Sequence, residues 1–299
     1  MSVAESSPNR AVDRIPATWL VVTSILSVQV GAAIAKHLFG TIPATSMVWL
    51  RLVSSAVVLL ALARPRLTTR SGRDWVVALL FGVMLLGMNW SIYQSFARIP
   101  LGMAVTLEFL GPLTLSVVLS RRSSDLVWVG LAAVGVGLLG FTPHGLTWVG
   151  VGFALAAGAF WAGYIVLAER TGRTWPGLTG LAVASLVGAV VLAGPAIAEG
   201  GSALLDPAVI GIGLAVGLLS SVIPYSLELM ALRRMNRRVF SVLMSLEPAA
   251  AALAAMVLLR EWLAPLQWLA IACVIGASVG ATRAARPAAV PTEAQRLTD

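Results

Sequence analysis

Charged residues are scarce in this sequence. Asp, Glu, Lys and Arg together make up 11% of the 299 residues, whereas hydrophobic residues make up 58% and the mean hydropathy is +0.89. A soluble domain contains about 25% charged residues, because polar groups have to cover its surface. A chain with so little charge cannot cover a soluble core, so a single soluble domain is excluded.

Cysteine, histidine and lysine are almost absent as well. Cys273 is the only cysteine, which excludes an intramolecular disulfide. The two histidines, His37 and His144, are too few to form a metal-ligand cluster. Lys36 is the only lysine beside twenty arginines. We therefore predict that this position needs a compact, titratable ammonium group. The alternative, which explains Lys36 equally well, is that its side chain anchors a helix at the outer surface of a lipid bilayer.

Motifs for ATP binding and for nucleophilic catalysis are also missing. The chain contains no Walker loop, so we expect no ATP-driven mechanism. It contains no Gly-x-Ser-x-Gly motif and no Ser, His and Asp order that would support a nucleophile. We predict that the protein is not an enzyme and has neither a cofactor nor a metal.

Long apolar runs are what the sequence has instead. One membrane span takes about 20 residues, and ten apolar segments of suitable length follow one another with short loops between them. The fold class predicted is an all-α membrane protein with ten transmembrane helices, flanked by polar tails at residues 1–16 and 283–299. The predicted spans are 17–37, 43–63, 74–96, 100–119, 126–142, 149–168, 178–198, 208–231, 239–259 and 264–282.

Basic residues are distributed unevenly between the two sides of the predicted membrane. Seventeen arginines fall in the tails and loops of one side, whereas only Lys36, Arg98 and Arg260 fall on the other. Loops rich in arginine mark the cytoplasmic side, so both termini are predicted to be cytoplasmic. The net charge of +8 is then an orientation signal in a lipid bilayer rather than a nucleic-acid site.

The two halves of the chain resemble each other. The segment at 126–140 aligns with the segment at 266–280, and FARIPLGMAVTLEFLGP, ending at Pro112, aligns with LRRMNRRVFSVLMSLEP, ending at Pro248. Each half holds five spans, so the second half enters the membrane with the opposite orientation. Such inverted repeats are typical of secondary transporters, whose substrate site lies between the halves near the midplane. The predicted repeats are residues 17–142 and 149–282.

Several stretches resemble one family of transporters. They are GAAIAKHLF, LGMAVTLEFLGPL, SRRSSDLVWVGLAAVG, IPYSLELMALRR and RRVFSVLMSLEPAAAALAAMVLLREWLAPLQWLAI. The chain resembles the drug/metabolite transporter superfamily with two tandem EamA domains, and more narrowly its bacterial threonine/homoserine exporter branch. The resemblance covers nearly the whole chain except the tails and residues 170–205. It implies ten helices in the bacterial inner membrane and export of small amino acids driven by the proton-motive force.

Ionisable residues within the predicted spans are costly to bury and are therefore functional candidates. Glu108 and Glu247 lie at nearly equivalent places in the two repeats, each shortly before a proline. A carboxyl group in a low dielectric can gain and lose a proton as a cavity opens to water and closes. We predict that both hold a substrate ammonium group or the coupling proton. The alternative is structural, with each carboxylate paired to an arginine or satisfying backbone groups freed by Pro112 and Pro248.

Arg51 is the arginine placed inside a predicted span. A guanidinium group can bind a substrate carboxylate through two parallel hydrogen bonds. It can equally form a fixed pair with Glu108, or extend outward to the interface. All three possibilities are compatible with its position in the sequence.

The remaining candidates are polar and aromatic residues on helix faces. Tyrosine and tryptophan offer an apolar wall with a polar tip and suit a cavity lining, although interfacial belts use the same residues. Glu228 is expected to pair with the arginines at 233–238 or to lie at the cytoplasmic mouth. These candidates are Gln29, Asn89, Tyr93, Trp161, Tyr164, Tyr225 and Glu228.

The sequence therefore predicts a secondary active transporter that exports threonine- or homoserine-like amino acids in exchange for protons, by alternating access. The alternative is the same fold exporting other small metabolites or toxic compounds. An intramembrane enzyme is disfavoured because the carboxylates lack histidine or cysteine partners, and a membrane sensor would not need paired carboxylates. The glycine pairs Gly213–Gly217 and Gly276–Gly280 permit close helix packing within the monomer or in a homodimer.

Overall fold

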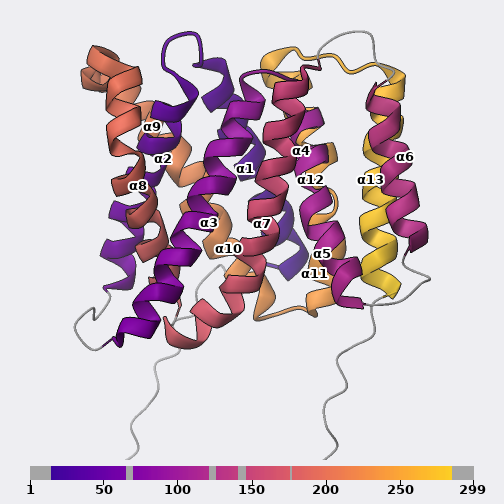
Figure 1. Ribbon diagram of the computed structural model, residues 1–299, viewed down its shortest axis with the longest axis horizontal. Helices are drawn as coiled ribbons and strands as arrows, with labels where there is room; N and C mark the ends of the chain where they lie inside the picture. Colours follow the sequence, from indigo (N-terminus) through magenta and orange to yellow (C-terminus); the bar gives the residue numbers. More distant parts are fainter. Residues whose placement is uncertain (1–14, 65–69, 121–125, 141–145, 176, 285–299) are drawn as a thin grey trace, which may run out of the picture.

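The computed structural model describes residues 15–64, 70–120, 126–140, 146–175 and 177–284, and the regular structure in this part of the chain is helical. Helices satisfy their own backbone hydrogen bonds, which is what lipid demands of a spanning segment. The helices run side by side between two opposite ends of the molecule (Figure 1). The prediction of an all-α membrane protein is confirmed.

The first half of the chain forms six helices. Proline precedes α1, α2 and α4, and α3 begins with a capping box in which Ser71 and Asp74 bond each other's backbone N–H groups. The helices are α1 (Ala17–His37), α2 (Ala44–Ala63), α3 (Gly72–Phe96), α4 (Leu101–Glu108), α5 (Leu110–Ser120) and α6 (Leu126–Gly140).

The second half begins with two long helices and continues with shorter ones. Two of its segments, η4 and η5, are π-helical turns, and η3 is a 3₁₀ turn. The elements are α7 (Trp148–Thr174), α8 (Thr179–Gly200), η3 (Gly201–Leu205), α9 (Pro207–Gly217), η4 (Leu218–Val222), α10 (Ile223–Leu232), α11 (Arg237–Met244), α12 (Glu247–Ala254), η5 (Ala255–Leu259) and α13 (Pro265–Ala284).

Nine segments of the described chain are long and apolar enough to cross a membrane, and α6 is a shorter apolar helix at the place of the remaining predicted span. Three of these membrane-spanning segments contain an interruption of the α-helix. The span after α3 is divided at Phe109, another contains the π-turn η4, and a third is divided at Ser245 and Leu246. Residues 141 and 142 of the predicted fifth span lie outside the described residues, as do residues 1–14 and 285–299 of the tails.

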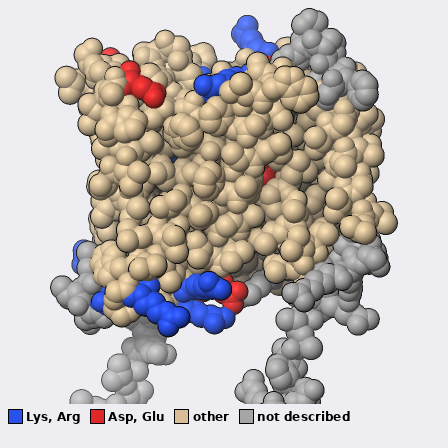
Figure 2. Space-filling view, viewed as in Figure 1, with Lys and Arg blue, Asp and Glu red and all other residues tan. Residues whose placement is uncertain are grey.

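Most described arginines lie at one end of the molecule, and Figure 2 shows more blue atoms at its lower end than at its upper end. The ends of α2, α7, α10 and α13 and the starts of α3 and α11 lie together there (Figure 1). The described arginines next to these helix ends are Arg64, Arg70, Arg73, Arg170, Arg173, Arg233, Arg234, Arg238 and Arg283. We call this end the basic end. Arg10, Arg14, Arg66, Arg121, Arg122, Arg286 and Arg296 lie outside the described residues.

Close packing brings helices of the two halves together. The helix α3 lies along α7, α2 along α8, α4 along α12, and α6 along α13. The glycine pairs predicted to permit close packing face helices of the same chain: Gly213 and Gly217 lie against α2, and Gly276 and Gly280 lie against α6. These glycines are thus explained by packing within the monomer, and a homodimer stays a prediction.

Candidate functional site

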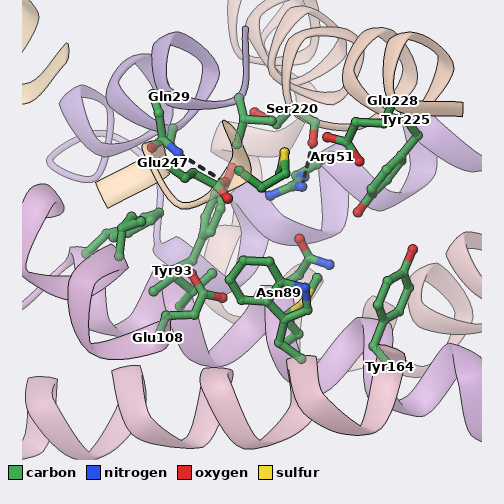
Figure 3. Close-up of a pocket in the computed structure, with 18 residues that line it drawn as sticks. Gln29, Arg51, Asn89, Tyr93, Glu108, Tyr164, Ser220, Tyr225, Glu228 and Glu247 are labelled. Carbon is green, nitrogen blue, oxygen red and sulfur yellow. Dashed lines mark hydrogen bonds between the residues drawn. The ribbon is translucent and has the colours of Figure 1, made fainter. Parts of the chain in front are cut away.

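A cavity of about 140 Å³ lies between the two halves of the chain. Its walls come from α1, α2, α3, α4, α7, η4, α10, α11 and α12 (Figure 3). Ten of the eleven residues singled out from the sequence line it, namely Gln29, Arg51, Asn89, Tyr93, Glu108, Trp161, Tyr164, Tyr225, Glu228 and Glu247. Spans far apart in the sequence therefore bring nearly all the candidate side chains to one place.

Glu108 enters the cavity because α4 ends there. Proline has no backbone N–H, so Pro112 cannot donate to the carbonyl of residue 108, and the helix is interrupted after Glu108. A Cβ atom at Gly158 of α7 would lie 2.5 Å from this same carbonyl oxygen, so glycine is required for α7 to approach the break. Glu108 itself is only 9% exposed.

Glu247 lies at the corresponding break in the second half. Pro248 cannot donate to the carbonyl of Met244, and α11 ends at Met244. Glu247 then opens α12, and its Oε1 accepts a hydrogen bond of 3.2 Å from Gln29 Nε2 of α1. Its other oxygen, Oε2, is buried and has no partner in the described protein. The carboxylate therefore keeps an acceptor available at the cavity.

Arg51 projects from the middle of α2 and is 6% exposed. Its Nε donates to Ser221 Oγ at 3.1 Å, its Nη2 to the backbone oxygen of Ser220 at 2.8 Å, and its Nη1 to the Tyr93 hydroxyl at 3.4 Å. All three acceptors are neutral. The alternative of a fixed pair with Glu108 is not what the structure has, and neither is an outward extension.

Glu228 contacts α1 rather than the arginines at 233–238, and its alternative place at the cytoplasmic mouth stays a prediction. It lines the cavity, and its Oε1 accepts a hydrogen bond of 2.7 Å from Ser24 Oγ of α1. The helix α10 turns this face toward α1 rather than toward the arginines at 233–238. The expectation that Glu228 pairs with those arginines is therefore replaced by a position at the cavity wall.

Aromatic side chains form much of the remaining wall. Trp161 meets Phe109 edge to face with ring centroids 5.3 Å apart, and Tyr164 stacks on Phe81 at 4.7 Å. Both tyrosines on the basic-end side, Tyr164 and Tyr225, point their hydroxyl groups into the cavity region (Figure 3). The structure thus assigns these rings to a cavity lining and not to an interfacial belt.

Lys36 is the candidate that lies elsewhere. It forms an ion pair of 2.6 Å with Glu261, which follows η5, and donates to the backbone oxygen of Ile99 at 2.8 Å. Glu261 also accepts a hydrogen bond of 2.9 Å from Leu101 N at the start of α4. Lys36 and Glu261 thereby join three segments at the end opposite to the basic end. Lys36 is outside the cavity, so a contact with a solute there is not supported.

The cavity carries an unbalanced set of charges. It contains one guanidinium group and three carboxyl groups, and full ionisation would give a net charge of −2. Within the described residues, Arg51, Glu108, Glu228 and Glu247 form no ion pair with one another. Uncompensated charge is costly in a low dielectric. The site is therefore suited to ligands that bring charges of both signs and to protons.

Ser220 is the polar lining residue that the sequence interpretation missed. It is 2% exposed, lines the cavity, and its Oγ has no partner among the described residues. Two consecutive serines in an apolar span, shortly before Pro224, are the signal that was available. The apolar part of the lining, including Val105 and Phe96, was also not singled out.

Comparison with known proteins gives a consistent result. The model of the EamA-like transporter family matches residues 148–283. The chain is 40% identical to the threonine/homoserine exporter RhtA of Escherichia coli K12 over 275 residues, which cover 90% of this chain and 93% of that protein. It is 39% identical to the threonine/homoserine exporter RhtA of Salmonella typhimurium SL1344 over 271 residues, 88% of this chain and 92% of that protein.

The fold also occurs in a solved crystal structure. That chain superposes with a TM-score of 0.63 at 22% sequence identity, and the match covers 95% of this chain and 99% of the other. This likeness concerns the fold. The sequence identity to the curated relatives decides the family: the chain belongs to the EamA-like transporters of the drug/metabolite transporter superfamily, in the branch of the threonine/homoserine exporters, and it is not an enzyme.

Proposed function

We propose that this protein exports small amino acids of the threonine and homoserine type across the bacterial inner membrane in exchange for protons. The observation that carries the proposal is the cavity between the halves, where one guanidinium group and three carboxyl groups lie without ion pairs among them. A zwitterionic amino acid brings a carboxylate that can bind the guanidinium group and an ammonium group that can bind the carboxyl groups. The curated relatives, which are named as threonine/homoserine exporters, support the same substrate class.

The size of the cavity favours a small solute. Pockets for drug-sized ligands have volumes of about 300–1,000 Å³, whereas this cavity has about 140 Å³. Arg51 is the group for the substrate carboxylate, since a guanidinium can bind it with two hydrogen bonds. Glu108 and Glu247 are the groups for the ammonium, whose three N–H donors need acceptors.

Proton exchange follows from the same charges. When no substrate is present, protons on the carboxyl groups reduce the net negative charge of the cavity. An incoming ammonium group makes such protonation unnecessary, so substrate and proton compete for the carboxylates. Competition for one site, with the site exposed to one side of the membrane at a time, is sufficient for antiport.

The inverted repeat is supported by the helix breaks. The helices α4 and α11 end at residues 108 and 244, four residues before Pro112 and Pro248, and the two breaks are related by the sequence offset of 136. Broken helices at a repeat interface near the membrane midplane are characteristic of secondary transporters.

Helix contacts support the repeat independently. Exchanging the two halves maps the contact of α3 with α7 onto that of α10 with α1, and the contact of α5 with α7 onto that of α12 with α1. The same exchange maps the contact of α3 with α8 onto that of α9 with α2. The pairs of α2 with α8 and of α6 with α13 map onto themselves.

Alternating access is supported by unequal burial around the cavity. Lining residues toward the Lys36 end, namely Tyr93, Phe96 and Val105, are 3% exposed or less. Lining residues toward the basic end, namely Tyr164, Tyr225 and Glu228, are half-buried. We assign the basic end to the cytoplasm because of its arginines. We therefore propose that this conformation is closed to the outside and that both termini are cytoplasmic.

Counterflow in proteoliposomes tests the substrate. Vesicles loaded with unlabelled threonine or homoserine are expected to take up labelled threonine transiently, without an imposed ion gradient. Vesicles loaded with alanine, leucine and a panel of drug-like cations define the range of solutes. Exchange of drugs but of no amino acid would favour the alternative function on this fold and contradict the proposal.

A further inference from the structure

The π-helical turn η4 determines how Arg51 is oriented. The side chain of Arg51 reaches from α2 to η4, where Ser221 Oγ and the backbone oxygen of Ser220 accept from Nε and Nη2 at 3.1 and 2.8 Å. The two contacts come from consecutive residues of one turn. They fix a long, flexible side chain along one edge of its planar group.

Because η4 occupies one edge of the Arg51 guanidinium group, a different edge of that group remains for a ligand. A guanidinium group has five N–H donors in one plane. The donors of Nε and of the adjacent side of Nη2 face η4, and the Tyr93 hydroxyl lies 3.4 Å from Nη1. The edge between Nη1 and Nη2 can then take a carboxylate in the two-bond geometry of arginine–carboxylate pairs. Arg51 lines the cavity, and neither of the contacts with η4 uses this edge.

Glycine residues allow η4 to pack closely against α1 and α2. A Cβ atom at Gly217, directly before η4, would collide with Ser54 of α2 and would lie 3.0 Å from the Arg51 backbone oxygen. A Cβ atom at Gly31 of α1 would collide with Ser220 Oγ. The turn is therefore wedged between α1 and α2 at the depth of Arg51. π-Turns are rare and occur frequently at functional sites.

We infer that Ser221 is a positioning residue, which holds Arg51 so that its Nη1–Nη2 edge receives the carboxylate of the transported amino acid. This inference rests on the proposed function, because it assigns one subsite of the same cavity. Ser221 does not bind the substrate itself. Its hydroxyl acts through Arg51 and sets the preference for solutes that carry a carboxylate.

The test compares substitutions of equal size. Ser221→Thr keeps the hydroxyl and Ser221→Val replaces it with a methyl group, while Ser221→Ala removes it without adding volume. Loss of one hydrogen bond corresponds to about a threefold to tenfold change in an equilibrium constant. We expect Ser221→Val and Ser221→Ala to raise the KM for threonine by about that factor, with kcat within about twofold, and Ser221→Thr to retain the wild-type KM.

Competition by an analogue that lacks the carboxylate separates positioning from a general structural effect. Threonine amide has the ammonium group and the side chain but no carboxylate. Wild-type protein is expected to prefer threonine strongly over the amide as an inhibitor of labelled threonine exchange. In Ser221→Ala that preference is expected to fall by the same factor as the KM rises. A loosened structure would weaken both inhibitors equally.

The control is Ser226→Ala in α10. Its hydroxyl donates to the backbone oxygen of Val222 at 2.7 Å and does not line the cavity. It is expected to keep the wild-type KM and the preference for threonine. Wild-type exchange with unchanged KM in Ser221→Val and Ser221→Ala would overturn the positioning role alone. Wild-type protein that exchanges no amino acid would overturn this role together with the proposed function.

Discussion

Arg51, Glu108, Glu228 and Glu247 are charged residues that a purely structural role explains poorly. A buried charge is normally retained because it has an opposite charge as partner. Here the described partners of Arg51 are neutral, and Glu247 and Glu228 contact Gln29 and Ser24. The charges of these side chains are therefore available to bind a solute that enters the cavity.

Removal of the negative charge of Glu108 or of Glu247 tests this interpretation. Glu108→Gln and Glu247→Gln keep the side-chain shape but neither bind a proton nor attract an ammonium group as a charge. A hydrogen bond to a charged group contributes about 1.5–3 kcal/mol. Each variant is therefore expected to lower proton-coupled threonine transport by roughly tenfold or more, measured in proteoliposomes with a pH-sensitive dye inside.

The matched control is Glu199→Gln, because Glu199 lies exposed near the end of α8. It is expected to transport at the wild-type rate. Full activity of both Glu108→Gln and Glu247→Gln would show that neither carboxylate carries charge in the transport cycle.

At the scale of elements, the two proline breaks are the features that place the carboxylates. Without Pro112, residue 112 would donate to the Glu108 carbonyl and α4 would continue into α5. The Pro112→Ala variant is therefore expected to keep or raise the thermal transition temperature, because proline is unfavourable inside a helix by about 3 kcal/mol. Its transport is expected to fall by roughly tenfold, as after loss of one charged contact.

Pro195→Ala provides the comparison, since Pro195 lies inside α8 and is exposed on the outer surface. That variant is expected to transport normally. Equal transport in Pro112→Ala and wild type would mean that the break does not position Glu108.

The contacts of Lys36 and Glu261 are the second device at this scale. They connect the end of α1, the turn before α4 and the segment after η5. In Glu261→Gln the ion pair with Lys36 is lost. The end of the protein opposite to the basic end is then expected to open more often. A cysteine at Phe96, in a Cys273→Ser background, should then react about threefold to tenfold faster with an impermeant thiol reagent added outside.

The control for this experiment is Glu169→Gln. Glu169 also forms an ion pair of 2.6 Å, with Arg173, but both side chains are more than 70% exposed, and exposed pairs contribute little. It is expected to leave the labelling rate unchanged. A labelling rate that stays at the wild-type value in Glu261→Gln would exclude a closing role for the pair.

At the scale of the whole molecule, the helical fold and the cavity residues were predictable to different degrees. Apolar length identifies a span directly, so the described helices fall on the predicted segments. Glu108, Glu247 and Arg51 were predictable because ionisable groups are rare in lipid-spanning segments. The position of Glu228 depends on how α10 is rotated against α1, and no local pattern determines that rotation.

Other features required the structure. Pro112 and Pro248 were visible in the sequence, but the close approach of α7 to the Glu108 carbonyl at Gly158, where α4 ends, required the tertiary structure. The role of Ser220 and Ser221 depends on a π-turn, which has no sequence signature. The partner of Lys36 comes from the other half of the chain, so pairing it with Glu261 needs the tertiary fold.

The exchange of protons for a small amino acid is tested most directly by accumulation against a gradient. Proteoliposomes with an acidic interior and an alkaline exterior are supplied with labelled threonine outside. Outward movement of protons is predicted to drive threonine inward to a concentration above that outside, and nigericin, which collapses the pH gradient, is predicted to abolish this accumulation. Threonine levels that equilibrate but never exceed the outside concentration, with and without the pH gradient, would contradict proton antiport.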